Sequence, residues 1–399
     1  MYQVVFLAGL VALASASPAA QGIDFASINA APSPSVTGPP VSVNSQSFNY
    51  NTASANAAGS AAVTGIASAS ASGSQAANSK RNFSPSTTTQ KVSTGTATTS
   101  SETACATVPE AGTSCGFIKP ENSCAVQPDG YGPHVTPDTV AAFTAYPEFH
   151  TQAKAAKAPA GYTRTFADLD GSLSGSTYLG LYTLQSYDVS LCAQHCDSTA
   201  LCTGFNIYVE RDPSLNPSPN CTLPSSITNY KCTLWGSNVD AIIATNEGQY
   251  RGQFQVVIAG SDGFTKTNTT TPAQCPGWQQ PQNCGSYAHN HPSTCIGTAF
   301  FSGPYDPLLC ASYAQAQNAL NSKSNSWKQW MQSYNALQCN FFNAFMLKKN
   351  GRPLGTYCGL YTQSYGAGEA TYSPGWQGSD YWSIESSWGF SIINGARSW

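Results

Sequence analysis

The sequence predicts an α+β protein in which two small modules, each with one helix on an antiparallel sheet, follow a disordered leader. Three observations predict it: fourteen cysteines between Cys105 and Cys358, an internal repeat, and a low-complexity N-terminal region. Modules this small need disulfides because their cores are modest. We expect a signal peptide over 1–16, a leader over 17–104, a first module with an N-terminal extension over 105–268 and a second module over 269–399.

The first residues, MYQVVFLAGLVALASASPAA, form an uncharged apolar run of signal-peptide length. Within it, Ala14-Ser15-Ala16 has the small-x-small pattern of a cleavage site. The run is too short for a comfortable membrane span, and no later stretch is long enough to supply one. We therefore expect a secreted protein, extracellular or in the cell wall, with no membrane span.

The leader contains no charged residue from Phe25 to Ser79, and Ala, Ser, Thr and Gly dominate it. Such a segment buries too little apolar surface to offset the entropy of ordering it, so we expect disorder. Lys80-Arg81 is the first basic pair, and a kexin-type processing site and an ordinary solvated pair are equally open interpretations. Asn-x-Ser/Thr sequons predict N-glycans at Asn82, Asn220 and Asn268.

Order is expected to begin near Cys105. Thr136 as N-cap and Pro137 at the first helical position predict a helix, which Pro147 should interrupt. Two strand-like runs follow, over 162–166 and 178–184.

The internal repeat is the most informative feature of the sequence. YDVSLCA and YDPLLCA match in register, and CTGFNIY has its echo in CNFFNAF. Downstream, gapless alignment gives nine identities: Cys232/Cys358, Leu234/Leu360, Ala241/Ala367, Ala244/Ala370, Thr245/Thr371, Gly252/Gly378, Ile258/Ile384, Gly263/Gly389 and Phe264/Phe390. The chain therefore carries two tandem copies of one unit.

Each copy begins with a helix. Asp188 and Asp306 are expected N-caps, the second with Pro307 at the first helical position. Cys192 and Cys310 should face the core from these helices. Three strands are expected to follow: one with the Phe-Asn echo, one opening with CTLW or CGLY, and one in QFQVVIAG or DYWSIES.

The run LCAQHCDSTALCTGFNIY … KCTLWG resembles the PAN/apple superfamily in its helical Cys-x-x-x-Cys, its Cys before a Phe-containing strand and its Cys-x-Leu. Ala314 replaces the second helical cysteine in the second copy, so Cys339 lacks its expected partner. The disulfides that the resemblance implies are Cys192–Cys232, Cys196–Cys202 and Cys310–Cys358. The pairing of the other cysteines stays open: Cys105, Cys115, Cys124, Cys221, Cys275, Cys284, Cys295 and Cys339.

More closely, the chain resembles a group of secreted fungal proteins with a Ser/Ala-rich leader, a dibasic pair and two such modules. In proteins of this kind the modules bind proteins or carbohydrates and are not catalytic. The resemblance therefore implies an extracellular glycan or protein as partner, no cofactor and no enzyme activity. The runner-up is a structural cell-wall or host-interaction protein.

Charge and histidines argue against other classes of function. Only 9% of residues are charged and the formal net charge is −3, so a basic footprint for nucleic acid is absent. None of the five histidines lies in a recognisable catalytic motif. His289 and His291 could offer two nitrogens to a metal ion, but no third ligand has a recognisable spacing, so we predict no metal site.

A carboxylate-dependent glycoside hydrolase is the third and least favoured hypothesis, with Asp168, Glu210 and Asp212 as its candidate acids. The echo aligns Glu210 with Leu347 and Asp212 with Lys349, so these acids do not recur. The sequence therefore predicts no catalytic residue.

Aromatic side chains are the better binding candidates because they pack on sugar rings and dominate protein interfaces. Trp382, Trp388 and Tyr381 are the chosen candidates, and Trp376 is assigned to the core. Tyr381 and Trp382 should point to opposite faces of a strand, so one of them should be exposed.

Overall fold

The computed structural model describes residues 23–30, 45–46, 51–63, 122–128, 130–267, 271–324 and 337–393. Several predictions fall outside these residues: the signal peptide over 1–16, the basic pair Lys80-Arg81, the sequons at Asn82 and Asn268, and the cysteines Cys105 and Cys115.

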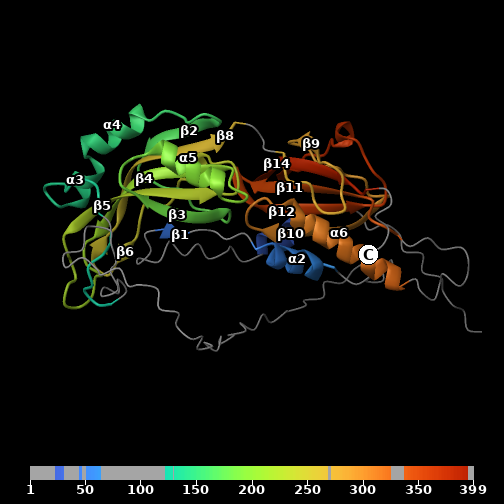
Figure 1. Cartoon of the computed structure of the whole chain (residues 1–399), viewed down its shortest axis with the longest axis horizontal. Coiled ribbons are helices and arrows are strands. Elements are labelled where there is room, and N and C mark those ends of the chain that lie inside the picture. The colour runs from blue at the N-terminus through green and yellow to red at the C-terminus, as the bar shows by residue number, and fades with distance from the viewer. Residues whose placement is uncertain are drawn as a thin grey trace, which may run out of the picture.

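Two antiparallel sheets lie side by side, each with its own helix (Figure 1). The strand order of the first sheet is β1 (Ser45–Gln46), β3 (Tyr178–Leu184), β5 (Ser226–Trp235), β4 (Gly204–Pro213), β8 (Val257–Lys266) and β2 (Tyr162–Leu169). The order of the second is β10 (Cys295–Ser302), β12 (Arg352–Tyr361), β11 (Phe341–Lys349), β14 (Asp380–Ser391) and β13 (Gly375–Gln377), with β9 (Gln282–Gly285) also on β14. The fold is thus mixed, with more sheet than helix.

The two sheets follow the same path through the chain. The order β3-β5-β4-β8-β2 in the first corresponds to β10-β12-β11-β14-β9 in the second. Helix α5 (Val189–Ser198) precedes β4 as helix α6 (Pro307–Ser324) precedes β11. The caps are those expected, since the Oδ1 atoms of Asp188 and Asp306 accept backbone N–H bonds at 2.9 Å. The sequence repeat is therefore a repeat of topology.

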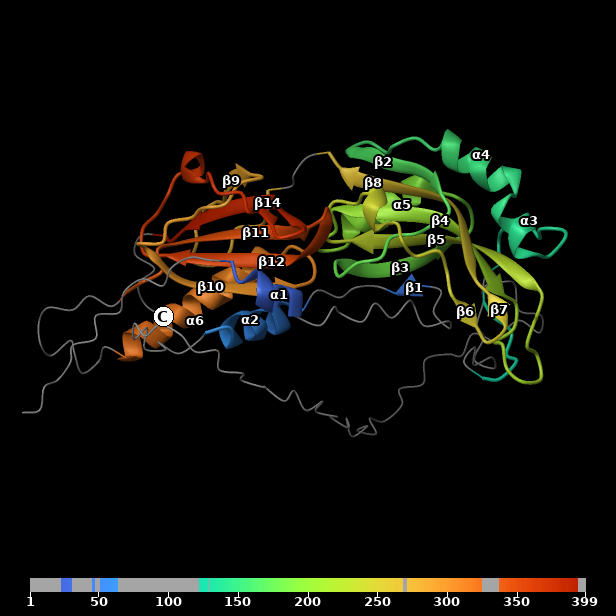
Figure 2. The ribbon, with the colours of Figure 1, turned by 180° about the vertical axis from the view of Figure 1, so that it is seen from behind.

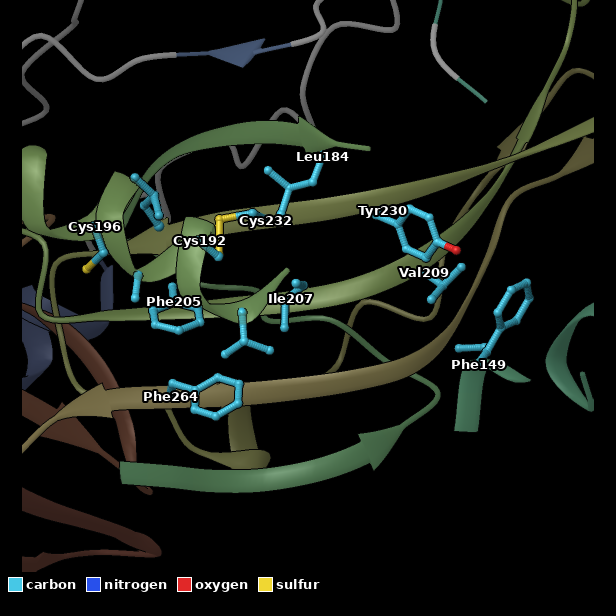
Figure 3. Close-up of a cluster of buried hydrophobic side chains, with 14 of the residues drawn as sticks. Phe149, Leu184, Cys192, Cys196, Phe205, Ile207, Val209, Tyr230, Cys232 and Phe264 are labelled. Carbon is cyan, nitrogen blue, oxygen red and sulfur yellow. A yellow bond between two sulfur atoms is a disulfide. The ribbon is translucent and has the colours of Figure 1, made fainter. Parts of the chain in front are cut away.

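The phenylalanine of the echo belongs to the core of each copy. Phe205 stacks on Phe264 with ring centroids 4.9 Å apart, and Phe342 stacks on Phe390 at 4.5 Å. Figure 3 shows Phe205 and Ile207 on the side of β4 that helix α5 covers, where the Cys192–Cys232 disulfide joins α5 to β5.

The asparagine of the echo ties the sheet to a loop. Asn206 Oδ1 accepts the Leu173 N–H at 3.0 Å, and its Nδ2 donates to Ser261 Oγ and to the Asp262 carbonyl, both at 2.9 Å. Asn343 repeats these bonds, each at 3.0 Å, with His289, Ser387 and Trp388. Because all are buried, the recurring asparagine has a structural role in both copies.

A disulfide links the helix to the equivalent strand in each copy. The structure contains the three pairs expected from the sequence, Cys192–Cys232, Cys196–Cys202 and Cys310–Cys358. A fourth, Cys124–Cys221, joins the N-terminal extension to the loop between β4 and β5, where Asn220 of the sequon is exposed. Among the described cysteines, four are buried without a disulfide: Cys275, Cys284, Cys295 and Cys339.

The extension contains two short helices, one before and one beginning at Pro147. The first, α3 (Val140–Thr144), starts three residues later than predicted because Thr139, not Thr136, accepts the capping N–H bond. Pro147 divides the helix as expected, and it also opens α4 (Pro147–Ala155) at the first helical position. Such a proline has no N–H that the helix would need.

The prediction of a wholly disordered leader needs correction, since three of its segments are ordered against the modules. They are α1 (Phe25–Ala30), β1 and α2 (Thr52–Ala61). Figure 2 shows α1 and α2 beside the second sheet and helix α6, while β1 pairs with the outer edge of β3. Tertiary contacts supply the stability that the local sequence lacks. Within the described ranges, no helix is long and apolar enough to cross a membrane.

Candidate functional site

A β-hairpin in each module presents an exposed aromatic side chain at the same aligned position. The first hairpin consists of β6 (Tyr250–Arg251) and β7 (Phe254–Gln255), and the second of β13 with the start of β14. Tyr250 and Trp376, which the alignment equates, are each 69% exposed. Both modules therefore offer an aromatic ring to solvent.

A glycine at the turn explains why these side chains are presented alike. Gly252 and Gly378, two residues after the aromatic in each copy, have φ of +62° and +66°. This left-handed conformation is readily adopted by glycine and strained for most other residues. The recurring glycine therefore fixes the same tight turn in both hairpins.

In the second module a second aromatic enlarges the exposed surface. Tyr381 faces Trp376 across the hairpin, with ring centroids 5.3 Å apart, and it is 42% exposed. Asp380 and Gln377 form the adjacent cross-strand pair, and Asp380 accepts a bond from Asn350 Nδ2 at 2.9 Å. The tip thus combines two aromatic rings with polar groups.

In the first module Tyr250 lies between two open hollows. One, of about 500 Å³, is lined by Tyr250 with the polar side chains of Asp170, Glu247 and Gln249. The other, of about 380 Å³, is lined by Tyr250 with Asp138, Arg211, Leu223 and Phe254. An aromatic ring flanked by carboxylates and amides matches the needs of a sugar, which offers apolar C–H faces and a ring of hydroxyls.

Of the three aromatics chosen from the sequence, only Tyr381 is available to a ligand. Trp382 is 1% exposed and Trp388 is 4% exposed. Trp388 packs with Trp278 and Phe342 in the core under α6, and Trp382 is covered by Phe25 of the leader helix α1. Neither can be a contact residue in this arrangement, which corrects both choices; the expectation that Tyr381 and Trp382 differ in exposure is confirmed.

Trp376, assigned to the core from the sequence, belongs instead to the exposed pair. The signal that could have placed it is the shared spacing Tyr-x-Gly and Trp-x-Gly, at Tyr250 and Trp376. A glycine at this distance marks a turn, and a residue beside a two-residue turn lies at the exposed end of a hairpin.

The candidate acids Glu210 and Asp212 lie on one face of β4 and are largely buried. Lys231 Nζ lies 4.0 Å from Glu210 Oε1 and 3.8 Å from Asp212 Oδ2, and Asn229 Nδ2 donates to Asp212 at 2.7 Å. Burial, followed by the neighbouring Asp212 charge, holds the pKa of the Glu210 carboxyl well above its usual range, although Lys231 opposes this.

This pair does not have the geometry of a glycosidase. Glu210 and Asp212 hydrogen-bond to each other, whereas the two carboxyl groups of a glycosidase stand about 5 Å or more apart. We interpret them, with Lys231, as a buried network that orders this end of β4.

Asp168, the third candidate acid, clamps helix α4 to the sheet. Its Oδ1 accepts from His150 Nδ1 at 2.6 Å, and its Oδ2 pairs with Lys154 at 3.0 Å. The Asp168 backbone N–H donates to Asp262 Oδ1 at 2.8 Å. All of these partners belong to the protein's own scaffold, so the arrangement favours a structural role.

Asp262, the buried counterpart of Trp388, makes the stability depend on pH. Burial raises the pKa of Asp262 to about 6, although the Asp168 N–H and Arg164, 3.6 Å away, favour the charged form. The folded state therefore keeps a proton that the unfolded chain releases near 3.8, and the free energy of unfolding falls as pH rises through this window. In the wild type this fall amounts to about 3 kcal/mol, and we expect the Asp262→Asn variant to lack it.

The measurement is urea unfolding of both proteins from pH 4 to pH 7. The difference in free energy of unfolding between Asp262→Asn and the wild type should change steadily up to about pH 6 and then level off. Asn238→Ala, at an exposed side chain that carries no charge, is the control and should leave the wild-type slope unchanged. A constant difference at every pH would contradict the assignment.

The two histidines considered for metal binding lie together but inside the second module. His289 is buried, with its Nδ1 3.2 Å from His291 Nε2 and its Nε2 3.6 Å from Cys284 Sγ. Burial lowers the pKa of His289 to about 4, so the ring is neutral at ordinary pH. In the part of the chain that the structure describes, no group of three or more metal-ligating side chains occurs.

Comparison with known proteins finds no match to this chain, whether among family models, curated proteins or solved structures.

Proposed function

We propose that the protein is a secreted, non-catalytic binding protein whose two apple-like modules recognise carbohydrate through their aromatic hairpin tips. The contact residues in this proposal are Tyr250 in the first module and Trp376 with Tyr381 in the second. Residues such as Trp382 and Trp388 support the modules from within.

The exposed aromatic at one repeated position carries the proposal. The largest fully buried side chains include Trp235, Trp278 and Trp382, so exposure at the hairpin tips is not the general condition of large aromatics here. Exposed aromatics on a rigid turn supply large contact area at little entropic cost. Two such tips on one chain would also allow bivalent binding to a polymeric glycan.

The structural context agrees with an extracellular location. Four disulfides occur among the described residues, and disulfides persist mainly in oxidising compartments. Together with the apolar N-terminal run of the sequence, they support secretion, and the low content of charged residues is compatible with a cell-wall environment.

The proposal is tested by retention of the purified protein on glycan arrays and cell-wall polysaccharides. We expect Tyr250→Ala and Trp376→Ala each to weaken binding by a factor of about ten, which corresponds to about 1.4 kcal/mol. On a polymeric glycan each single variant should also lose the gain from bivalent binding, and the double variant should lose more than either, because neither hairpin tip then binds.

Tyr287→Ala is the matched control, since Tyr287 is another exposed tyrosine but lies outside both hairpins. It should bind like the wild type. Equal losses for Tyr287→Ala and Tyr250→Ala, or no retention on any glycan, would contradict the proposal. The second of these results would favour the structural cell-wall or host-interaction role.

A further inference from the structure

The second module has an apolar surface on its sheet that helix α1 of the leader covers; we call this surface the socket. Ile28 of helix α1 is buried against five aromatic and aliphatic residues of the sheet: Phe345, Leu347, Tyr357, Trp382 and Ile384. The Phe25 ring lies 4.6 Å from the Trp382 ring, and Ile23 packs at the margin. Phe25 and Ile28 therefore act as the two anchors of a short helix.

Polar contacts fix the orientation of this helix. Asp24 Oδ1 accepts the Ser27 N–H at 3.0 Å and so caps α1. At the other end, Lys349 Nζ donates to Asn29 Oδ1 at 2.9 Å. The same lysine pairs with Asp380 at 2.9 Å, so the leader joins an ion pair of the hairpin that carries the exposed aromatics.

A second leader helix docks nearby through small residues. Gly59 of α2 lies so close to α6 that a Cβ there would come within 2.5 Å of the Leu309 carbonyl and 2.7 Å of Ser312 Cβ. Ser312 Oγ donates to Asn56 Oδ1 at 2.7 Å. Between the two helices in the sequence, β1 pairs with β3 of the first sheet, so the described segments of the leader contact both modules.

We expect this attachment to depend on the covalent connection. Among the described residues of the leader few are buried: Ile28, Ala55 and Gly59 are buried, and Ile23, Phe25, Ala62 and Val63 are half-buried. The conformational entropy lost when this segment becomes ordered offsets much of the favourable free energy of these contacts. A covalent tether offsets that loss by raising the effective concentration of the segment at its docking site. Once the tether is cut, the segment must compete by its weak intrinsic affinity alone.

We propose that the surface around Trp382 is a helix-docking site, that helix α1 of the leader is its resident occupant, and that cleavage at Lys80-Arg81 releases this helix together with the rest of the leader. The dibasic pair lies between the docked segment and the modules in the sequence, so a single cut there separates them. The free site then accepts a short helix with aromatic and aliphatic anchors three residues apart.

The test uses the full secreted chain, cut with a kexin-type protease, diluted and purified by size exclusion. The probe is a fluorescent peptide spanning residues 21–32, and binding is followed by anisotropy. We expect the N-terminal fragment to separate from the modules and the cut protein to bind the peptide at least tenfold more tightly than the uncut protein. Co-elution of the fragment, with no peptide binding, would overturn the proposal.

Three controls keep the result interpretable. Lys80→Ala/Arg81→Ala, treated with the same protease, should keep the site occupied and not bind the peptide. A peptide with Phe25→Ala and Ile28→Ala should not bind the cut protein, whereas one with Ala26→Ser, at an exposed position, should bind normally. Equal binding of the two altered peptides would show that Phe25 and Ile28 do not determine binding at this site, and it would overturn the proposal.

A variant that leaves the chain uncut gives an independent readout. Phe25→Ala/Ile28→Ala in the full chain should undock α1, so that the uncut protein binds the wild-type peptide and β14 exchanges its amide hydrogens faster around Trp382. The Ala26→Ser chain should behave like the wild type. Unchanged exchange and no peptide binding in the double variant would contradict the assigned contact.

Discussion

Asn206→Ala is expected to lower the free energy of unfolding by about 4 kcal/mol, because each buried group left without its partner adds about 1–3 kcal/mol to the lost bonds. The substitution removes the acceptor of the Leu173 N–H and both donors, to Ser261 Oγ and to the Asp262 carbonyl. All four residues are buried, so water cannot readily replace the lost partners. The measurement is denaturant unfolding with the disulfides intact.

The repeat supplies a second experiment with the same expectation. Asn343→Ala removes equivalent bonds to His289, Ser387 and Trp388 in the second module, so its effect should be of similar size. Asn238→Ala, at an exposed asparagine, should change stability by less than about 0.5 kcal/mol. If Asn206→Ala weakened ligand binding and left stability unchanged, the asparagine would belong to a binding site and our structural interpretation would be wrong.

Local sequence signals were sufficient to predict much of the scaffold. Asp188 and Asp306 indicate where helices begin, because an N-cap depends on only a few adjacent residues and can be recognised from the local sequence. The alternation of residues along β14 predicts that Tyr381 and Trp382 lie on opposite faces, and the repeat predicts that both copies share one topology. These features depend on neighbours in the sequence or on comparison within it.

The burial of Trp382 could not be predicted in this way, because its cover comes from Phe25 at the other end of the chain. A helix of six residues such as α1 has no stability of its own, and its leader sequence resembles a disordered tract. Only the placement of Ile23, Phe25 and Ile28 in an otherwise Ala/Ser-rich region hints at a docking element. Alternation along a strand shows which residues share a face, not which face is covered.

Removal of the Cys310–Cys358 disulfide, by changing both cysteines to alanine, should destabilise the second module by about 4 kcal/mol according to loop-closure entropy. The bridge spans 48 residues in the sequence and links α6 to β12 across the core. The first module has a second bridge near its helix, whereas in the second module Ala314 replaces the cysteine that would form one. Loss of this bridge therefore leaves α6 held only by noncovalent contacts, namely apolar packing and side-chain hydrogen bonds such as those of Asn318 with the Cys339 backbone.

The size of the effect should follow the length of chain that each bridge closes. The Cys192–Cys232 bridge spans 40 residues and should also contribute about 4 kcal/mol, whereas Cys196–Cys202 spans 6 and should contribute only about 2 kcal/mol. Thermal and denaturant unfolding of the three double-alanine variants should reproduce this order. Cys339→Ala is the matched control, because it removes a buried sulfur from the second module without breaking a bridge. If Cys339→Ala were as damaging as the loss of Cys310–Cys358, the stabilisation would come from packing of sulfur atoms in the core, and the cross-link would not be its source.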